Sequence, residues 1–221
     1  MLQLHYYPGN ASLIVHLVLE ELAVPFELRL VDRAQAAHRS AEYLALNPNG
    51  LIPVLVDDDS RGAGGAPLVL YETAAICLHL ADTHPAAELL PALGTRERAH
   101  AYKWLAWCTN TLQATITNYF YPERWAGDAA GTVIVKALAE TKVGAMLDQI
   151  DAELARHGGP WFLGDRFSVV DPYAFVLCRW TRGFTRPARE LPHIKPWLDR
   201  MLARPALQRA FKREHLAAPL V

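Results

Sequence analysis

Hydrophobic and polar positions follow two different patterns along the chain, and the change falls near residue 83. Before it, short apolar runs typical of strands alternate with stretches of helical period. These runs predict strands at 2–7, 26–31, 52–56 and 68–71, and helices at 12–23, 41–46 and from residue 72 onwards. Beyond residue 95 the pattern predicts only helices, at 95–121, 130–157, 171–182 and 193–213, the last broken near Pro205.

The change of pattern predicts two domains joined by residues 83–94. Pro85, Pro91 and Gly94 interrupt the periodicity in that stretch. We expect a mixed α/β domain over 1–82, with the element order βαβαββα, followed by an all-α domain over 95–221. Within the first domain, residues 57–67 are expected to form a long, flexible hairpin turn.

The composition is that of a globular chain with a sizeable core, since 52% of its 221 residues are hydrophobic. No signal peptide or membrane-spanning run is evident, so we expect a cytoplasmic protein. Cys77, Cys108 and Cys178 are too scattered for a disulfide framework, and each lies in an apolar helical pattern that favours a buried thiol. The nine histidines form no ligand set of the His-Glu-x-x-His kind, so no metal site is predicted.

The charge distribution favours no polyanionic partner. The net charge is −1. Residues 179–213 carry ten Lys or Arg against two acids, but their spacing is that of solvated helix faces, and no nucleic-acid module is present. We therefore expect neither nucleic acid nor a membrane as a partner.

Two separated segments are suited to holding a peptide. Residues 47–50, Asn-Pro-Asn-Gly, form a turn signal that leads through Leu51 and Ile52 into Pro53, directly before an apolar strand. A cis bond before Pro53 would turn the N–H and C=O of Ile52 outward, free to pair with an extended ligand. The second segment, Glu72-Thr73, opens a helix whose unpaired N–H groups attract a carboxylate, and the Thr73 hydroxyl adds a donor.

Each segment also has a plainer interpretation, namely an ordinary turn and a helix start capped by its own side chains. Together, and followed by a long helical half, they resemble the cytosolic glutathione transferases, nearest the bacterial beta class. The resemblance covers nearly the whole chain and includes residues 162–171, where Ser168 and Asp171 have capping-box spacing. Thr73 stands where the family usually has serine, which keeps the hydroxyl.

The resemblance implies a thioredoxin-like first domain, glutathione as co-substrate, no other cofactor, and a homodimer. It places a set of residues around glutathione: Asn10, Leu51, Ile52, Pro53, Glu72 and Thr73. It also implies that the glutathione thiol, whose ordinary pKa is about 8.5, is shifted toward neutrality and attacks an electrophile as a thiolate.

Three residues near the start of the first helix are candidates to hydrogen-bond that thiolate. Ser12 matches a serine of the beta-class loop, and its alternative is a plain N-cap. Tyr6 matches the beta-class tyrosine, with a core strand residue as its alternative, and Asn10 is a third possible donor. Because Ala11 stands where the beta class has a cysteine, we expect no thiol–disulfide chemistry from this loop.

The electrophile pocket is expected along the long helix after residue 95. Gln113 and Ala114 replace a beta-class histidine and lysine, which makes this pocket less polar. Candidates for its wall are Asn110, Gln113, Tyr119 and Trp180, although aromatic residues at helical spacing often belong to a core. The expected activity is transfer of glutathione to small hydrophobic electrophiles. The alternative is a non-catalytic binding or stress-response protein of the same fold.

Overall fold

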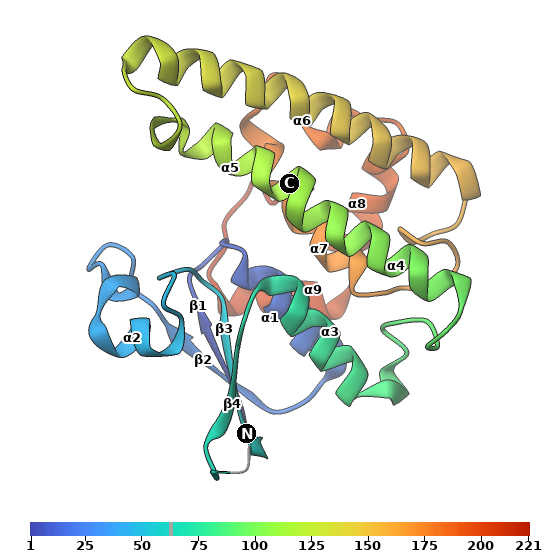
Figure 1. Ribbon diagram of the computed structural model, residues 1–221. Coiled ribbons are helices and arrows are strands. Elements are labelled where there is room, and N and C mark those ends of the chain that lie inside the picture. Colours follow the sequence, from blue (N-terminus) through green and yellow to red (C-terminus); the bar gives the residue numbers. More distant parts are fainter. Residues whose placement is uncertain (62–63) are drawn as a thin grey trace. The chain divides into compact units, whose positions relative to one another are not determined.

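The computed structural model describes residues 1–61 and 64–221, whose contacts form two compact units (Figure 1). The first unit comprises residues 1–88 and 204–217, and the second comprises 89–203 and 218–221. Gly62 and Ala63, which belong to the predicted hairpin turn, lie outside the described residues. The domain limits inferred from the sequence, 1–82 and 95–221, stay a prediction.

The first unit contains a four-stranded mixed sheet in the order β2-β1-β3-β4. Its strands are β1 (Leu2–Tyr6), β2 (Phe26–Leu30), β3 (Val54–Arg61) and β4 (Pro67–Tyr71). β1 pairs parallel with β2 and antiparallel with β3, which pairs antiparallel with β4. With α1 (Ser12–Leu22), α2 (Ala41–Leu46) and α3 (Thr73–Thr83), the predicted order βαβαββα is confirmed.

The strand β3 runs further than the sequence indicated. Residues 57–61 were assigned to a flexible turn, but the structure continues the strand through them. The Asp58 N–H donates to the Met1 carbonyl, and the Asp57 carboxylate accepts the N–H groups of Asp59 and Ser60. The carboxylate thus replaces ladder bonds where the β3–β4 register shifts. The turn prediction was wrong over this stretch, because local side-chain bonds extend an irregular strand.

Helices cover both faces of this sheet (Figure 1). Val54 and Leu55 are neighbours in β3 and are both fully buried, which requires cover on each side because alternate strand residues point to opposite faces. On one face, Val54 joins Val31, Tyr43 and Val56 in an apolar cluster beneath α2. Helices α1 and α3 lie against the other face.

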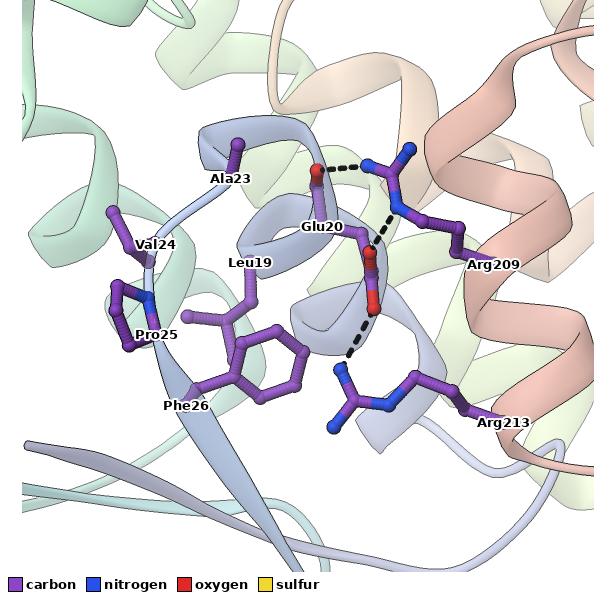
Figure 2. A pocket seen from close by; sticks show the side chains of 8 residues that line it. All are labelled: Leu19, Glu20, Ala23, Val24, Pro25, Phe26, Arg209 and Arg213. Atoms are coloured by element: carbon purple, nitrogen blue, oxygen red, sulfur yellow. Dashed lines mark hydrogen bonds and ion pairs between the residues drawn. The ribbon is translucent and has the colours of Figure 1, made fainter.

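The last helix, α9 (Pro205–Arg213), packs along α1 within the first unit. The sequence placed it at the end of the helical domain. Three arginines attach it to two acids of α1: Arg209 and Arg213, which line the groove shown in Figure 2, bind Glu20, and Arg204 binds Glu21. An amphipathic pattern shows that a helix has a buried face, but it does not show which element covers that face. Here the covering element is α1, which lies about 190 positions earlier in the chain.

The second unit is helical. Its α-helices are α4 (Arg96–Trp107), α5 (Ala114–Phe120), α6 (Ala129–His157), α7 (Val170–Trp180) and α8 (Ile194–Leu202). The predicted helix over 95–121 is interrupted: α4 and α5 are joined by a π-helical segment, Cys108–Gln113. π-Helical turns insert an extra residue into a helix and are frequent at functional sites. Within the described residues, no helix is long and apolar enough to cross a membrane.

The start of α7 confirms the carboxylate half of the predicted capping box. Asp171 accepts from the N–H of Ser168 at 2.9 Å, from the N–H of Phe162 at 2.8 Å and from the indole N–H of Trp197 at 3.0 Å. The Ser168 hydroxyl accepts the N–H of Val170. Burial raises the pKa of Asp171 to about 6, while these hydrogen bonds act in the opposite direction.

Candidate functional site

The turn before β3 is held rigidly by Asn47. Its side-chain amide donates to the Leu51 carbonyl at 2.9 Å, its side-chain oxygen accepts the Asn49 N–H, and its own carbonyl accepts the Gly50 N–H. Tyr43 donates a second hydrogen bond to the Leu51 carbonyl at 2.7 Å. Gly50 has a φ of +61°, and a Cβ there would lie 2.9 Å from a backbone oxygen, so only glycine fits. These contacts fix the approach of the chain to Ile52.

The bond between Ile52 and Pro53 is cis, as the sequence suggested. Both residues precede the first ladder pair of β3, which begins at Val54. Within residues 1–61 and 64–221, the N–H and C=O of Ile52 form no hydrogen bond with the protein. Ile52 therefore offers one backbone donor and one backbone acceptor to an extended ligand.

The start of α3 carries no side-chain cap. The first intrahelical bond runs from the Ile76 N–H to the Glu72 carbonyl, so the N–H groups of the three preceding residues point out of the helix end. Thr73 is 7% exposed, and its hydroxyl has no partner in the described part of the chain. Glu72 has a φ of +73°, a backbone conformation that is unfavourable for any residue other than glycine. An unfavourable backbone conformation beside unpaired donors is typical of a ligand site.

Sheet register brings three segments to one end of the sheet. Val54 pairs with Tyr71, so Pro53 and Glu72 lie at adjacent strand ends. His5 pairs with Val54, so the loop that follows β1 leaves the sheet at the same end. The predicted residues Tyr6, Asn10, Ser12, Leu51, Ile52, Pro53, Glu72 and Thr73 all belong to these three segments.

The loop after β1 is closed by its own hydrogen bonds. The Ser12 hydroxyl is buried, accepts the Tyr7 N–H and donates to the Tyr7 carbonyl, both at 3.1 Å. Ser12 is therefore no N-cap; Ala11 precedes the helix without a side-chain cap. The side-chain oxygen of Asn10 accepts the Ala11 N–H, so its amide nitrogen is left to donate elsewhere.

A buried acid from the C-terminal segment holds the same loop. Glu214 follows α9 and accepts the Gly9 N–H at 2.8 Å, while its other oxygen lies 2.7 Å from His16 Nδ1. His16 is fully buried in α1, and its Nε2 lies 3.6 Å from Glu20. Sequence reasoning missed Glu214 because the contact spans 205 positions; the only signal was one histidine inside the apolar run 13–19.

The remaining titratable candidates are poor sources of a reactive anion. Burial, followed by the nearby charge of Glu214, raises the pKa of Tyr6. Burial also raises the pKa of Cys77 and of Cys178 to about 12, and raises that of Cys108 further. All three thiols are buried, as the sequence indicated. None has the low pKa that a nucleophilic thiol needs.

The electrophile-pocket candidates lie in the second unit. Gln113 ends the π-helical segment. Its side-chain oxygen accepts the Tyr173 hydroxyl at 2.6 Å, which leaves the side-chain amide nitrogen as a donor. Asn110 is exposed in the same segment. Tyr119 packs on Phe184 with ring centroids 4.1 Å apart, and Trp180 is half-buried at the end of α7. Tyr119 thus contributes to packing, in line with the alternative that aromatic residues at helical spacing belong to a core.

Comparison with known families matches both parts of the chain. Residues 10–83 match the glutathione S-transferase N-terminal domain, and residues 107–205 match the C-terminal domain. The chain belongs to the glutathione S-transferase family. The thioredoxin-like first domain and the all-helical second domain that this fold comprises are therefore confirmed.

Curated relatives span nearly the whole of this chain. Glutathione S-transferase GST-4.5 of Xanthomonas campestris is 32% identical over 97% of this chain and 100% of its own. The disulfide-bond oxidoreductase YfcG of Escherichia coli is 29% identical over 98% of this chain and 97% of its own.

Solved structures of the family extend the likeness. A glutathione transferase homologue from Sulfitobacter, solved with bound glutathione, has a TM-score of 0.86 at 29% identity and covers 98% of this chain and 99% of its own. The beta-class enzyme of Sphingomonas chungbukensis has a TM-score of 0.79 at 28% identity, over 97% of this chain and 100% of its own. The resemblance to bacterial beta-class transferases is thus confirmed.

Proposed function

We propose that this protein binds glutathione at the end of the sheet formed by the β1–α1 loop, Ile52-Pro53 and the start of α3, and transfers it to small hydrophobic electrophiles. One observation carries the proposal. Three segments that sheet register brings together each leave hydrogen-bond donors without a protein acceptor within the described residues. The structure from Sulfitobacter holds glutathione in the same fold, which supports a peptide as the ligand.

Each segment has a role in this proposal. Thr73 and the open N–H groups of α3 bind a carboxylate of glutathione, aided by the positive end of the helix. Ile52 pairs its backbone with that of the tripeptide, with Leu51 and Pro53 shaping the approach. Glu72, exposed and at φ +73°, accepts from the ammonium group.

Among the three candidates for the thiolate donor we favour Asn10. Its amide nitrogen has no acceptor in the described part of the protein, so donating to sulfur breaks no existing bond. Ser12 would have to release the Tyr7 carbonyl first. Tyr6 is a weaker donor because its pKa is raised. Hydrogen bonds to a thiolate lower the thiol pKa.

The electrophile is proposed to bind among Asn110, Gln113, Tyr119 and Trp180. Gln113 supplies an amide donor held in place by Tyr173, which suits electrophiles that carry a hydrogen-bond acceptor. Following the family resemblance, we propose that the protein is a cytoplasmic homodimer with a role in detoxification.

Calorimetric titration with glutathione, followed by an assay of its conjugation to a chlorodinitrobenzene, tests the proposal. We expect saturable binding and a conjugation rate above the uncatalysed reaction. Binding without turnover would support the non-catalytic alternative, which the engaged hydroxyl of Ser12 and the raised pKa of Tyr6 favour. Absence of binding would overturn both.

The thiol donor is identified by the pKa of bound glutathione, followed through thiolate absorbance against pH. Asn10→Ala should raise this pKa by about one unit, whereas Ser12→Ala and Tyr6→Phe should raise it less. If Ser12→Ala raises the pKa of bound glutathione most, the Ser12 hydroxyl of the unchanged protein turns from Tyr7 to the sulfur. Ser12 then replaces Asn10 as the proposed donor.

The relative YfcG makes disulfide reduction a necessary control. Ala11 and three buried cysteines leave this protein without a reactive thiol of its own, so we expect no mixed disulfide with oxidised glutathione by intact mass. Ala11→Cys should form one. An adduct on the unmodified protein would show that a buried cysteine becomes accessible.

A further inference from the structure

Three side chains of the second unit form a chain of hydrogen bonds around the hydroxyl of Tyr173. Tyr173 is fully buried in α7, and its hydroxyl lies 2.6 Å from the side-chain oxygen of Gln113 and 3.0 Å from the Thr109 hydroxyl. The Thr109 hydroxyl also lies 3.0 Å from the Leu105 carbonyl oxygen. Thr109 and Gln113 are four residues apart in the π-helical segment, so they lie on the same side of it and meet one hydroxyl.

This chain has fewer hydroxyl protons than short contacts. A hydroxyl carries one proton, so Thr109 donates either to Leu105 or to Tyr173, and not to both. When Tyr173 donates to Gln113, two protons therefore serve only two of the three contacts. The amide nitrogen of Gln113 forms no hydrogen bond within residues 1–61 and 64–221. In this direction of the chain, Gln113 offers a ligand a donor.

A half-turn of the Gln113 amide group reverses the chain. A primary amide has an oxygen and a nitrogen of similar size, so the rotation exchanges an acceptor and a donor at the same two positions. The Gln113 nitrogen then donates to the Tyr173 hydroxyl, which donates to Thr109. Thr109 in turn donates to the Leu105 carbonyl, so every contact has a proton. In this reversed direction, Gln113 offers a ligand an acceptor.

The two directions are closely balanced within the protein. The reversed chain has one more hydrogen bond, but 2.6 Å is an ordinary separation for an O–H···O bond and a short one for N–H···O. Gln113 is half-buried and Tyr173 is fully buried, so a ligand reaches the amide group and not the hydroxyl behind it. A ligand that bonds to one direction only will therefore shift the chain to that direction.

We propose that Gln113 determines specificity with two polarities, and that Tyr173 and Thr109 are its positioning residues. Gln113 donates to electrophiles that carry an acceptor, such as a nitro or carbonyl group. It accepts from electrophiles that carry a donor, such as an amino group. This role rests on the proposed function, because it places the electrophile beside Gln113.

Three phenethyl bromides test the proposal: one with a para nitro group, one with a para amino group and one with neither. In each, the glutathione sulfur forms a bond to the carbon that carries bromine, and bromide leaves with the electron pair of the broken bond. Thr109→Val removes the hydroxyl that the reversed chain needs, so kcat/KM for the amino compound should fall roughly three- to tenfold, the effect of one hydrogen bond. The values for the other two compounds should not change.

Thr115→Val is the matched control, because its hydroxyl donates to the Thr111 carbonyl of the same helical stretch and not to Tyr173. It should leave all three values unchanged. An equal fall for the nitro and amino compounds in Thr109→Val, or the same pattern in the control, would overturn the proposal.

Gln113→Glu should have the opposite preference. A carboxylate can accept from Tyr173 but has no donor, so kcat/KM for the nitro compound should fall and that for the amino compound should be retained. Retention of the nitro value and loss of the amino value would overturn the role of Gln113.

A binding measurement separates this role from catalysis. The side-chain amide signals of Gln113 in isotope-labelled protein are identified by their absence in Gln113→Leu. The unreactive para-ethylnitrobenzene and para-ethylaniline should both shift these signals in the unchanged protein, and only the nitro compound should shift them in Thr109→Val. If these shifts appear in a protein that conjugates none of the bromides, the transferase proposal fails and the two polarities stand. Absence of a shift with either compound would overturn them.

Discussion

Two helix starts in this molecule carry the same kinds of residue, but side chains cap only one of them. At α7, Ser168 and Asp171 close the helix end from within, and the carboxylate accepts three N–H donors in a fully buried position. At α3, Glu72 and Thr73 leave the N–H groups without a side-chain cap, and Glu72 takes an unfavourable backbone conformation. Both have a hydroxyl and an acid beside N–H groups that no intrahelical hydrogen bond uses.

The difference shows how a helix end becomes structural or available to a ligand. In α7 the acid lies inside the helix, three residues after the serine, and its side chain can turn back to the helix end. In α3 the acid precedes the helix and is exposed, so no carboxylate of residues 1–61 or 64–221 caps this helix end. A carboxylate from outside can then bind there.

The largest effect is expected from removing the internal carboxylate. Asp171→Ala leaves the N–H groups of Phe162, Ser168 and Trp197 buried without an acceptor, which should lower the free energy of unfolding by about 3 to 5 kcal/mol. Urea denaturation measures this. Asp165→Ala, an exposed acid nearby, should change it by less than about 0.5 kcal/mol. Similar losses in both variants would remove the contrast between the two helix starts.

The next effect concerns the open helix end. Thr73→Val keeps the shape of the side chain but removes the hydroxyl, and should weaken glutathione binding by about 1 to 3 kcal/mol. Thr73→Ser, which keeps the hydroxyl, should bind within about 0.5 kcal/mol of the unchanged protein. Calorimetry distinguishes the two. An unaltered dissociation constant for the valine variant would exclude Thr73 from the site.

A smaller effect depends on pH. The folded-state pKa of Asp171, about 6, lies above the ordinary value of 3.8, so the folded state binds this proton more tightly than the unfolded state. Lowering the pH from about 7.5 to about 5 should therefore increase the stability advantage of the unchanged protein over Asp171→Asn, by about 1 kcal/mol. Denaturation curves at both pH values test this. If the stability advantage of the unchanged protein is smaller at low pH, the pKa of Asp171 is lowered on folding and the prediction is wrong.

The smallest effect is expected at Glu72. Glu72→Gly relieves the unfavourable conformation and should raise the free energy of unfolding by about 0.5 to 1 kcal/mol in the absence of glutathione, while weakening its binding. Glu72→Ala loses the same carboxylate but keeps a Cβ, so it should bring no stabilisation. Equal stabilities of the two variants would show that the conformation is not strained.

The fold was predictable where local pattern determines it. Alternating apolar runs located the strands β1 to β4 and the α-helices α1 to α3, although β3 runs further than expected, because burial on one face imposes a period of two or 3.6 residues. The π-helical segment before Ala114 was not predictable, since an extra residue in a helix leaves the apolar pattern almost unchanged. Nor was the docking of α9 on α1, which depends on arginine–glutamate pairs far apart in sequence.

The candidate site divides in the same way. The turn at Asn47 and the helix start at Thr73 carry local signals, and the sequence identified both. The contacts of Ser12 with Tyr7 arise from the path of one loop, and residue type alone could not distinguish them from a cap. Glu214 reaches Gly9 only in the folded chain, so no local pattern indicates it.

The placement of α9 in the first unit has a consequence for how the protein is made. Residues 1–88 leave the ribosome long before residues 204–217, which complete their unit and hold the loop at Gly9. At synthesis rates of about 5 to 20 residues per second, the intervening chain takes roughly 6 to 23 s to appear. During that interval the nascent sheet lacks its final helix and the buried His16 lacks its acid partner, Glu214. The sheet of the first unit, although encoded first, therefore waits for residues 204–217 before its unit is complete.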